Sequence, residues 1–226
     1  QWDSRIGFPQ QNKIGDYYDQ ESDDVGVFVA YAATLNGEQD VYFLRSEDLG
    51  RTWKTPELRL EKGHPIGSGY LEGFTFAASA DSTGDHLYVV TQVAPQLYGP
   101  NDLFLVASND GGVSFGSAVP ISSLTGTGVD VRAGAFALIA NGLDVAVLWI
   151  DDRSGGALSN SGDLFFRTSS DGGASFSTPE ILLDTTSGLD GGEIFGPTVA
   201  VRGLDIAVAW SEVLAPQSCF EPRVAV

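Results

Sequence analysis

One aligned position in successive repeats carries the side chains best suited to chemistry. The position is occupied by Asp16, Glu72, Arg132 and Glu193, with Tyr17 and Tyr18 beside the first. Glu72 lies 43 residues before Phe115, and Arg132 lies 44 residues before Phe176, so the register of the repeat brings them into correspondence. If each of the four aligned residues starts the inner strand of its own repeat unit, their side chains surround one axial mouth, with Tyr17 and Tyr18 nearby.

Such a ring is open to four kinds of chemistry. Arg132 can neutralise the neighbouring acids in a structural salt-bridge plug. Carboxylate oxygens are hard ligands suited to Ca²⁺. A sugar can stack on a tyrosine ring while the carboxylates accept hydrogen bonds from its hydroxyl groups. Two carboxylates about 5–9.5 Å apart would also suit glycoside hydrolysis, although sequence does not give that distance.

No residue is predicted to be catalytic. The two histidines, His64 and His86, have no partner pattern, and neither zinc-ligand spacing nor a Ser-His-Asp arrangement is visible. The metal content is left open, with Ca²⁺ as the one cofactor that the carboxylates favour.

The repeat that aligns these residues is the pattern Ser-x-Asp-x-Gly-x-x-(Trp/Phe), present three times. Its members are Ser46, Asp48, Gly50 and Trp53 in box 1; Ser108, Asp110, Gly112 and Phe115 in box 2; and Ser169, Asp171, Gly173 and Phe176 in box 3. The aspartates recur at intervals of 62 and 61 residues. A fixed period of this size predicts a repeat architecture.

The box is predicted to be a tight turn between two strands. Glycine adopts a positive φ without steric cost, and aspartate accepts hydrogen bonds from the backbone of its own turn. The aromatic residue begins the next strand. The box residues are therefore predicted to fold hairpins and to take no part in a reaction.

The segments around each box predict four strands per repeat. Short runs rich in valine, alanine and aromatic residues, such as residues 25–31, 87–91 and 145–149, alternate with turn residues. Four strands form one propeller blade. The predicted fold is all-β: a single β-propeller domain over residues 1–226, with blades at about 9–60, 61–122, 123–185, and 186–226 plus 1–8.

The N-terminal segment is predicted to complete the last blade. Trp2 and Ser4 fit the aromatic-x-Ser/Thr register that follows each box, and a strand from Trp2 to Phe8 would close a ring of four four-stranded antiparallel blades. The alternatives are donation of that strand to a neighbouring molecule, as in a filament, or a place in a larger propeller.

These boxes resemble the Asp-box, or BNR repeat, of sialidases and other secreted β-propellers. The resemblance implies a secreted or cell-surface protein with a glycan among its ligands. Sialidases are six-bladed, bind the substrate carboxylate with three arginines and use a Tyr–Glu pair with an acidic Asp. This chain departs from them: Arg5 is followed by Ile-Gly-Phe-Pro, Arg45 and Arg167 precede boxes, and Arg132 alone suits an inner strand.

The composition limits the classes of partner that this protein is expected to bind. The net charge is −18, which disfavours nucleic acid and anionic membranes. No apolar run approaches the roughly 18 residues of a membrane span. Because the chain begins at Gln1, without Met, a processed or trimmed product is expected. Cys219 is the only cysteine, which makes it a free thiol, an intermolecular bridge or simply a small loop residue.

The function predicted from these features is an extracellular, non-catalytic binding or assembly module directed at a glycan or another extracellular protein. One alternative is a sialidase-like glycoside hydrolase. Another is a structural subunit of a surface layer or filament that associates with itself through the Trp2–Phe8 strand or Cys219.

Overall fold

The computed structural model describes residues 18–22, 26–33, 40–60, 63, 70–81, 84–96, 99–153, 162–183, 193–202, 205–213 and 220–225. Every regular element among them is a β-strand, which confirms the all-β prediction. No helix in the described part is long and apolar enough to cross a membrane.

The strands form four antiparallel sheets in chain order. Sheet 1 contains β1 (Tyr18–Ser22), β2 (Val27–Ala33), β3 (Asp40–Ser46) and β4 (Leu58–Arg59). Sheet 2 contains β5 (Tyr70–Asp81), β6 (Gly84–Ala94), β7 (Asp102–Ser108) and β8 (Val119–Pro120). Sheet 3 contains β9 (Val131–Asn141), β10 (Asp144–Asp151), β11 (Asp163–Ser169) and β12 (Ile181–Leu182). Sheet 4 contains β13 (Glu193–Arg202), β14 (Asp205–Val213) and β15 (Phe220–Ala225).

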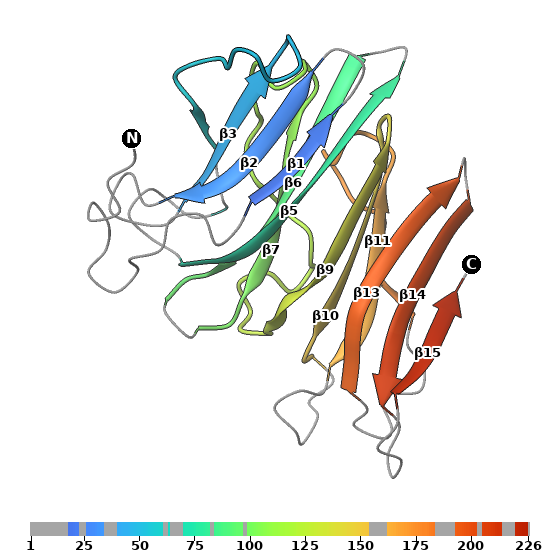
Figure 1. Cartoon of the computed structure of the whole chain (residues 1–226). Helices are drawn as coiled ribbons and strands as arrows, with labels where there is room; N and C mark the ends of the chain where they lie inside the picture. Colours follow the sequence, from blue (N-terminus) through green and yellow to red (C-terminus); the bar gives the residue numbers. More distant parts are fainter. Residues whose placement is uncertain are drawn as a thin grey trace.

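The sheets follow one another side by side through their first strands. β1 packs on β5, β5 on β9, and β9 on β13. Figure 1 shows this succession from β1–β3 at the upper left to β13–β15 at the lower right. Among the described residues, sheet 4 has three strands and does not pack against sheet 1. A fourth strand formed by Trp2 to Phe8, and closure of the ring, stay predictions, because residues 1–17 lie outside the described part.

Three apolar clusters join successive sheets, because each strand alternates its side chains between the two faces of its sheet. The first cluster joins sheets 1 and 2 around Phe43 and Val89, and the second joins sheets 2 and 3 around Leu105 and Trp149. The third joins sheets 3 and 4 around Leu148 and Trp210. Full burial of such side chains contributes about 1.5–3 kcal/mol each.

The outward face of sheet 4 has no such cover among the described residues. Val224 of β15 is 69% exposed, whereas the residues in the same register of the preceding sheets, Leu105 and Phe166, are 1% and 8% exposed. Within the described part of the chain, the sheets therefore form an array whose three interfaces between sheets are filled by apolar side chains, and no described residue covers the last face.

Candidate functional site

The predicted mouth lies at the end of the sheets opposite the boxes. In sheet 3, β9 begins at Val131, which pairs with Asp151 at the end of β10, and Asp151 pairs with Asp163 at the start of β11. β11 then ends at Ser169, the first residue of box 3. Because the same order holds in every sheet, the starts of the inner strands gather at one end of the molecule (Figure 1).

The backbone of the inner strands is irregular at these starts. The β5–β6 pairing shifts register between Leu71 and Gly73, on either side of Glu72. The β9–β10 register shifts between the Val131 and Phe136 pairs, a stretch that includes Arg132. The β13–β14 register shifts between Phe195 and Thr198, just after Glu193. Bulges bend a strand and redirect its side chains, and they are enriched next to binding sites.

Three predicted site residues are thus brought to one end of three adjacent inner strands. Glu72, Arg132 and Glu193 lie on β5, β9 and β13, which pack in that order. Tyr18 begins β1, which packs on β5. The side chains of these four residues are outside the described part, as are Asp16 and Tyr17 altogether. Their convergence into a ligand site stays a prediction.

Metal binding has no support within the described ranges. They contain no group of three or more His, Cys, Asp or Glu side chains arranged to hold an ion. A Ca²⁺ site at the mouth would depend on the carboxylates of Glu72, Glu193 and Asp16, and it stays a prediction.

The sequence analysis did not identify a set of buried carboxylates that lies at the mouth end of the sheets. Asp40, Asp102 and Asp163 begin the third strands of sheets 1, 2 and 3, and they are at most 9% exposed. Arg59 Nε donates to Asp40 Oδ2 at 2.5 Å, and the backbone N–H of Gly126 donates to both oxygens of Asp102 at 3.0 and 3.1 Å. These two carboxylates therefore anchor β4, through Arg59, and the segment after β8, through Gly126.

A charged cluster ties sheets 2 and 3 together. Arg153 Nε donates to Asp151 Oδ1 at 2.8 Å, and Nη1 pairs with Glu180. The guanidinium carbon lies 3.7 Å above the centre of the Phe165 ring. The backbone N–H of Ser123, which follows β8, donates to Glu180 Oε1 at 2.6 Å. The cluster fits a structural role, since its acidic oxygens already have partners.

The pKa values agree with that role. Burial alone would lower the pKa of Arg153, but hydrogen bonds to Asp151 and Glu180 outweigh it and leave the pKa raised. Burial would likewise raise the pKa of Glu180, yet the Ser123 N–H and Arg153 leave it lowered. Arg153 and Glu180 are thus both held in their charged forms.

The boxes have the hydrogen bonds expected of structural turns. In box 3, Ser169 Oγ donates to Asp171 Oδ1 at 2.7 Å and accepts from the Gly173 N–H at 2.8 Å. Asp171 also accepts from the Ser175 N–H at 2.9 Å and from its hydroxyl at 2.5 Å. Hydrogen bonds from Ser175, then from Ser169, lower the pKa of Asp171 to about 2. Boxes 1 and 2 repeat these contacts.

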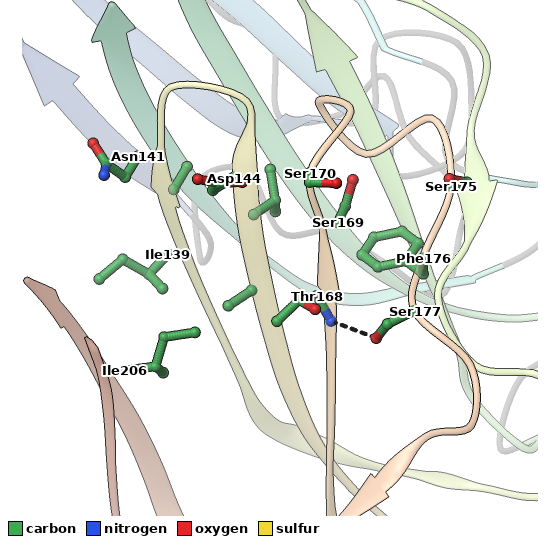
Figure 2. Close-up of a pocket in the computed structure, with 13 residues that line it drawn as sticks. Ile139, Asn141, Asp144, Thr168, Ser169, Ser170, Ser175, Phe176, Ser177 and Ile206 are labelled. Carbon is green, nitrogen blue, oxygen red and sulfur yellow. Dashed lines mark hydrogen bonds between the residues drawn. The ribbon is translucent and has the colours of Figure 1, made fainter. Parts of the chain in front are cut away.

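A cavity of about 380 Å³, which sequence reasoning did not predict, lies at the box end between sheets 3 and 4. Figure 2 shows Asn141 and Asp144 on one side, Phe176 on the other and Ile206 of β14 facing Ile139. Its volume falls at the lower end of the range of small-ligand sites, about 300–1,000 Å³.

Comparison with known protein structures identifies a sialidase-like β-propeller fold. No protein-family model and no curated protein matches the sequence. Among solved structures, the chain is similar to the GH93 α-L-arabinofuranosidase of Fusarium graminearum bound to arabinobiose, with 13% identity and a TM-score of 0.63. That match covers 97% of this chain and 64% of the arabinofuranosidase, so this chain spans slightly less than two thirds of its length.

Two sialidases show the same likeness. Trypanosoma rangeli sialidase in complex with the inhibitor DANA matches with 13% identity and a TM-score of 0.52, over 92% of this chain and 38% of the sialidase. A Hadza microbial sialidase matches with 14% identity and a TM-score of 0.51, over 88% of this chain and 42% of the sialidase. At such identities the likeness establishes a sialidase-like β-propeller fold and leaves the activity of this chain open.

Proposed function

We propose that this chain is an extracellular, glycan-directed β-propeller module that binds an oligosaccharide at the mouth formed by its inner strands. The observation that carries the proposal is the set of register shifts at the starts of β5, β9 and β13, where Glu72, Arg132 and Glu193 lie. Three adjacent strands depart from regular pairing at the same end, as expected where backbone is shaped for a ligand.

The chemistry of these residues suits a polyhydroxyl ligand. The carboxylates of Glu72 and Glu193 accept hydrogen bonds from sugar hydroxyl groups, and Arg132 donates to ring or carboxylate oxygens. Tyr17 or Tyr18 would add an aromatic surface for the face of a sugar ring. Arabinose- and sialic-acid-containing oligosaccharides are the first ligands to test, because the similar structures are arabinofuranosidases and sialidases.

The test is isothermal titration of the whole chain with arabino-oligosaccharides and with sialyllactose. Glu72→Gln, Arg132→Gln and Glu193→Gln are each expected to weaken binding at least tenfold, since each removes a charged hydrogen-bonding group, worth about 1.5–3 kcal/mol. Glu47→Gln, at the opposite end, is the matched control, because Glu47 is exposed and pairs with Lys54. Equal affinity in all four variants would contradict the proposal.

The second candidate is glycoside hydrolysis, favoured by the hydrolase activity that the similar structures share in name. A retaining mechanism needs two carboxyl groups about 5–5.5 Å apart, and an inverting one about 6.5–9.5 Å. Release of arabinose or sialic acid, lost in Glu72→Gln or Glu193→Gln with substrate binding retained, would favour the enzyme. Binding without release favours the module.

A further inference from the structure

The guanidinium group of Arg167 fills the interface between the outer parts of sheets 2 and 3. Arg167 is 7% exposed, and its Nη1 donates to the carbonyl oxygen of Ile121, which follows β8 in sheet 2. Its Nε donates to the carbonyl oxygen of Ser177 at 2.8 Å, and its Nη2 to that of Phe176 at 3.2 Å. The guanidinium carbon lies 5.6 Å from the centre of the Phe176 ring. Three carbonyl oxygens and one aromatic ring therefore form a site for a planar cation.

The backbone group that sheet 2 contributes to this site recurs in sheet 1. The N–H of Ile121 donates to the carbonyl oxygen of Leu103 at 3.0 Å, and the N–H of Leu60 donates to that of Val41 at 2.9 Å. Leu103 and Val41 each lie five residues before the first serine of their box. The carbonyl group of Leu60 in sheet 1 therefore corresponds to that of Ile121 in sheet 2.

The groups that sheet 3 contributes recur in sheet 2. The N–H of Ser177 donates to the carbonyl oxygen of Thr168 at 2.7 Å, and the N–H of Gly116 donates to that of Ala107 at 2.9 Å. Gly116 and Ser177 each follow the aromatic residue of their box, so Phe115 corresponds to Phe176. The interface between sheets 1 and 2 therefore repeats every group that binds the guanidinium of Arg167.

Sheet 2 has a valine where sheet 3 has that arginine. Val106 pairs with Val89 on the neighbouring strand, just as Arg167 pairs with Val147, and each lies two residues before the first serine of its box. The side chain of Val106 is fully buried and ends at its two methyl groups. A groove of about 350 Å³ lies between the outer parts of sheets 1 and 2, lined by residues 58–60 and 113–117. We call it the outer groove.

The outer groove presents hydrogen-bond acceptors to a ligand. Within the described ranges, no N–H or O–H group donates to the carbonyl oxygen of Leu60, Phe115 or Gly116. Such acceptors gain free energy from a donor that reaches them. Arg59 also lines the groove, but its Nε is paired with the buried carboxylate of Asp40 at 2.5 Å, which compensates its charge.

We propose that the outer groove binds an alkylguanidinium group, as found at the end of an arginine side chain. The group donates to the carbonyl oxygens of Leu60, Phe115 and Gly116 and lies beside the ring of Phe115, as Arg167 does at the corresponding groups. The net charge of −18 raises the local concentration of cations around the protein. The site does not depend on glycan binding, because it lies at the outer strands and the mouth at the inner ones.

The affinity is expected to be modest, because the outer groove lacks one partner that Arg167 has. Glu180 Oε1 lies 3.9 Å from Arg167 Nη1, and Glu180 immediately precedes β12. Ala118 immediately precedes β8 in sheet 2, so no carboxylate stands at that place. Backbone carbonyl groups and one ring alone give an expected Kd of about 1–10 mM. Guanidinium is preferred to ammonium, because its planar fork reaches several carbonyl groups and stacks on a ring.

The test is a titration of the full 226-residue chain with ethylguanidinium, followed by amide NMR at constant ionic strength. Saturable shifts are expected at the amides of Leu60, Gly116 and Ser117, with a Kd of about 1–10 mM. Ethylammonium carries the same charge without the fork, and it is expected to bind at least about threefold more weakly. The absence of saturable shifts at these amides, or equal affinity for the two cations, would overturn the proposal.

Variants of the chain test the location. Val106→Arg places a guanidinium in the groove from within, as Arg167 does, and is expected to weaken ethylguanidinium binding at least about tenfold. Because Val106 is buried, Ser117→Trp at an exposed position of the groove provides a second obstruction. Thr178→Trp is its matched control, since Thr178 is exposed at the same position of sheet 3. Folding is checked by circular dichroism. Wild-type affinity in folded Ser117→Trp, or equal losses in Ser117→Trp and Thr178→Trp, would overturn the proposal.

Two arginine ligands identify the source of the group. Free arginine carries its α-amino and α-carboxyl charges, whereas N-acetylarginine N-methylamide has the uncharged ends of a residue within a peptide. Tighter binding of the blocked compound would assign the groove to an arginine residue of a peptide chain. Tighter binding of the free amino acid would assign it to a small metabolite. If neither compound shifts the amides of Gly116 and Ser117, the proposal is wrong.

Discussion

Replacing Gly112 with alanine tests the packing of the boxes most sharply. Gly112 has a φ of 77°, and an added Cβ would lie 2.5 and 2.6 Å from Cε1 and Cζ of Phe43 and 2.9 Å from Cδ1 of Leu87. Both neighbours are 1% exposed, so neither can move into solvent. The substitution therefore combines backbone strain with overpacking.

Gly126 is a matched control for the backbone part. It has the same φ of 77°, but nothing lies within 4 Å of an added Cβ. Gly126→Ala is expected to lower the free energy of unfolding by about 1 kcal/mol, the cost of a left-handed conformation for a residue with a Cβ. Gly112→Ala adds about 1–3 kcal/mol of overpacking, for a total of about 2–4 kcal/mol.

Thermal unfolding followed by circular dichroism distinguishes the two variants. For a protein of 150–250 residues, 1 kcal/mol shifts Tm by about 2–4 °C, so Gly126→Ala is expected to lose about 2–4 °C and Gly112→Ala about 4–16 °C. Phe43→Leu combined with Gly112→Ala should cost less than the sum of the single changes. Equal Tm values for Gly112→Ala and Gly126→Ala would refute the packing of box 2 on Phe43.

Three other changes test the turns and the charged cluster. Leu49 has a φ of 58° at the position where the other two boxes have glycine, and it is 64% exposed. Leu49→Gly should therefore raise Tm, because it relieves about 1 kcal/mol of backbone strain. An unchanged or lower Tm would contradict this. The pKa of Asp171 is lowered to about 2 from 3.8, so the ionised carboxylate stabilises the fold above pH 4, and this stabilisation is lost as the pH falls towards 2. The difference in Tm between the wild type and Asp171→Ala should therefore shrink between pH 4 and pH 2. Arg153→Met removes the cation paired with the buried carboxylate of Asp151 and leaves Glu180 with Arg167, whose Nη1 lies 3.9 Å from Oε1. The change should cost about 3–5 kcal/mol in urea unfolding, whereas a loss below about 1 kcal/mol would show that these ion pairs do not stabilise the fold.

The parts of the fold that repeat were predictable from the sequence. Asp48, Asp110 and Asp171 fix the period, and the turn chemistry of serine, aspartate and glycine determines the hairpins around them. The apolar runs at 25–31, 87–91 and 145–149 correctly predict the second strand of each of the first three sheets. Local rules of this kind act within a few residues, so they need no knowledge of how the sheets are arranged.

The features that were missed depend on how sheets meet. The cavity beside Ala146 is lined by segments far apart in the sequence, at 139–146, 168–177 and 206, which no local pattern brings together. The Arg153–Glu180 pair joins residues 27 apart within sheet 3, and the Ser123 N–H links Glu180 to sheet 2. Asp40, Asp102 and Asp163 did carry a usable signal, since each lies eight residues before a box aspartate. Closure of the ring by Trp2 to Phe8 is still a prediction.

A crystal structure of the chain bound to an arabinose- or sialic-acid-containing oligosaccharide tests the central claim most directly. The account predicts the sugar at the mouth, with its hydroxyl groups within hydrogen-bonding distance, about 2.7–3.2 Å, of Glu72, Arg132 or Glu193. A sugar bound instead in the cavity beside Ala146 and Thr168, with the mouth unoccupied, would contradict the proposed site.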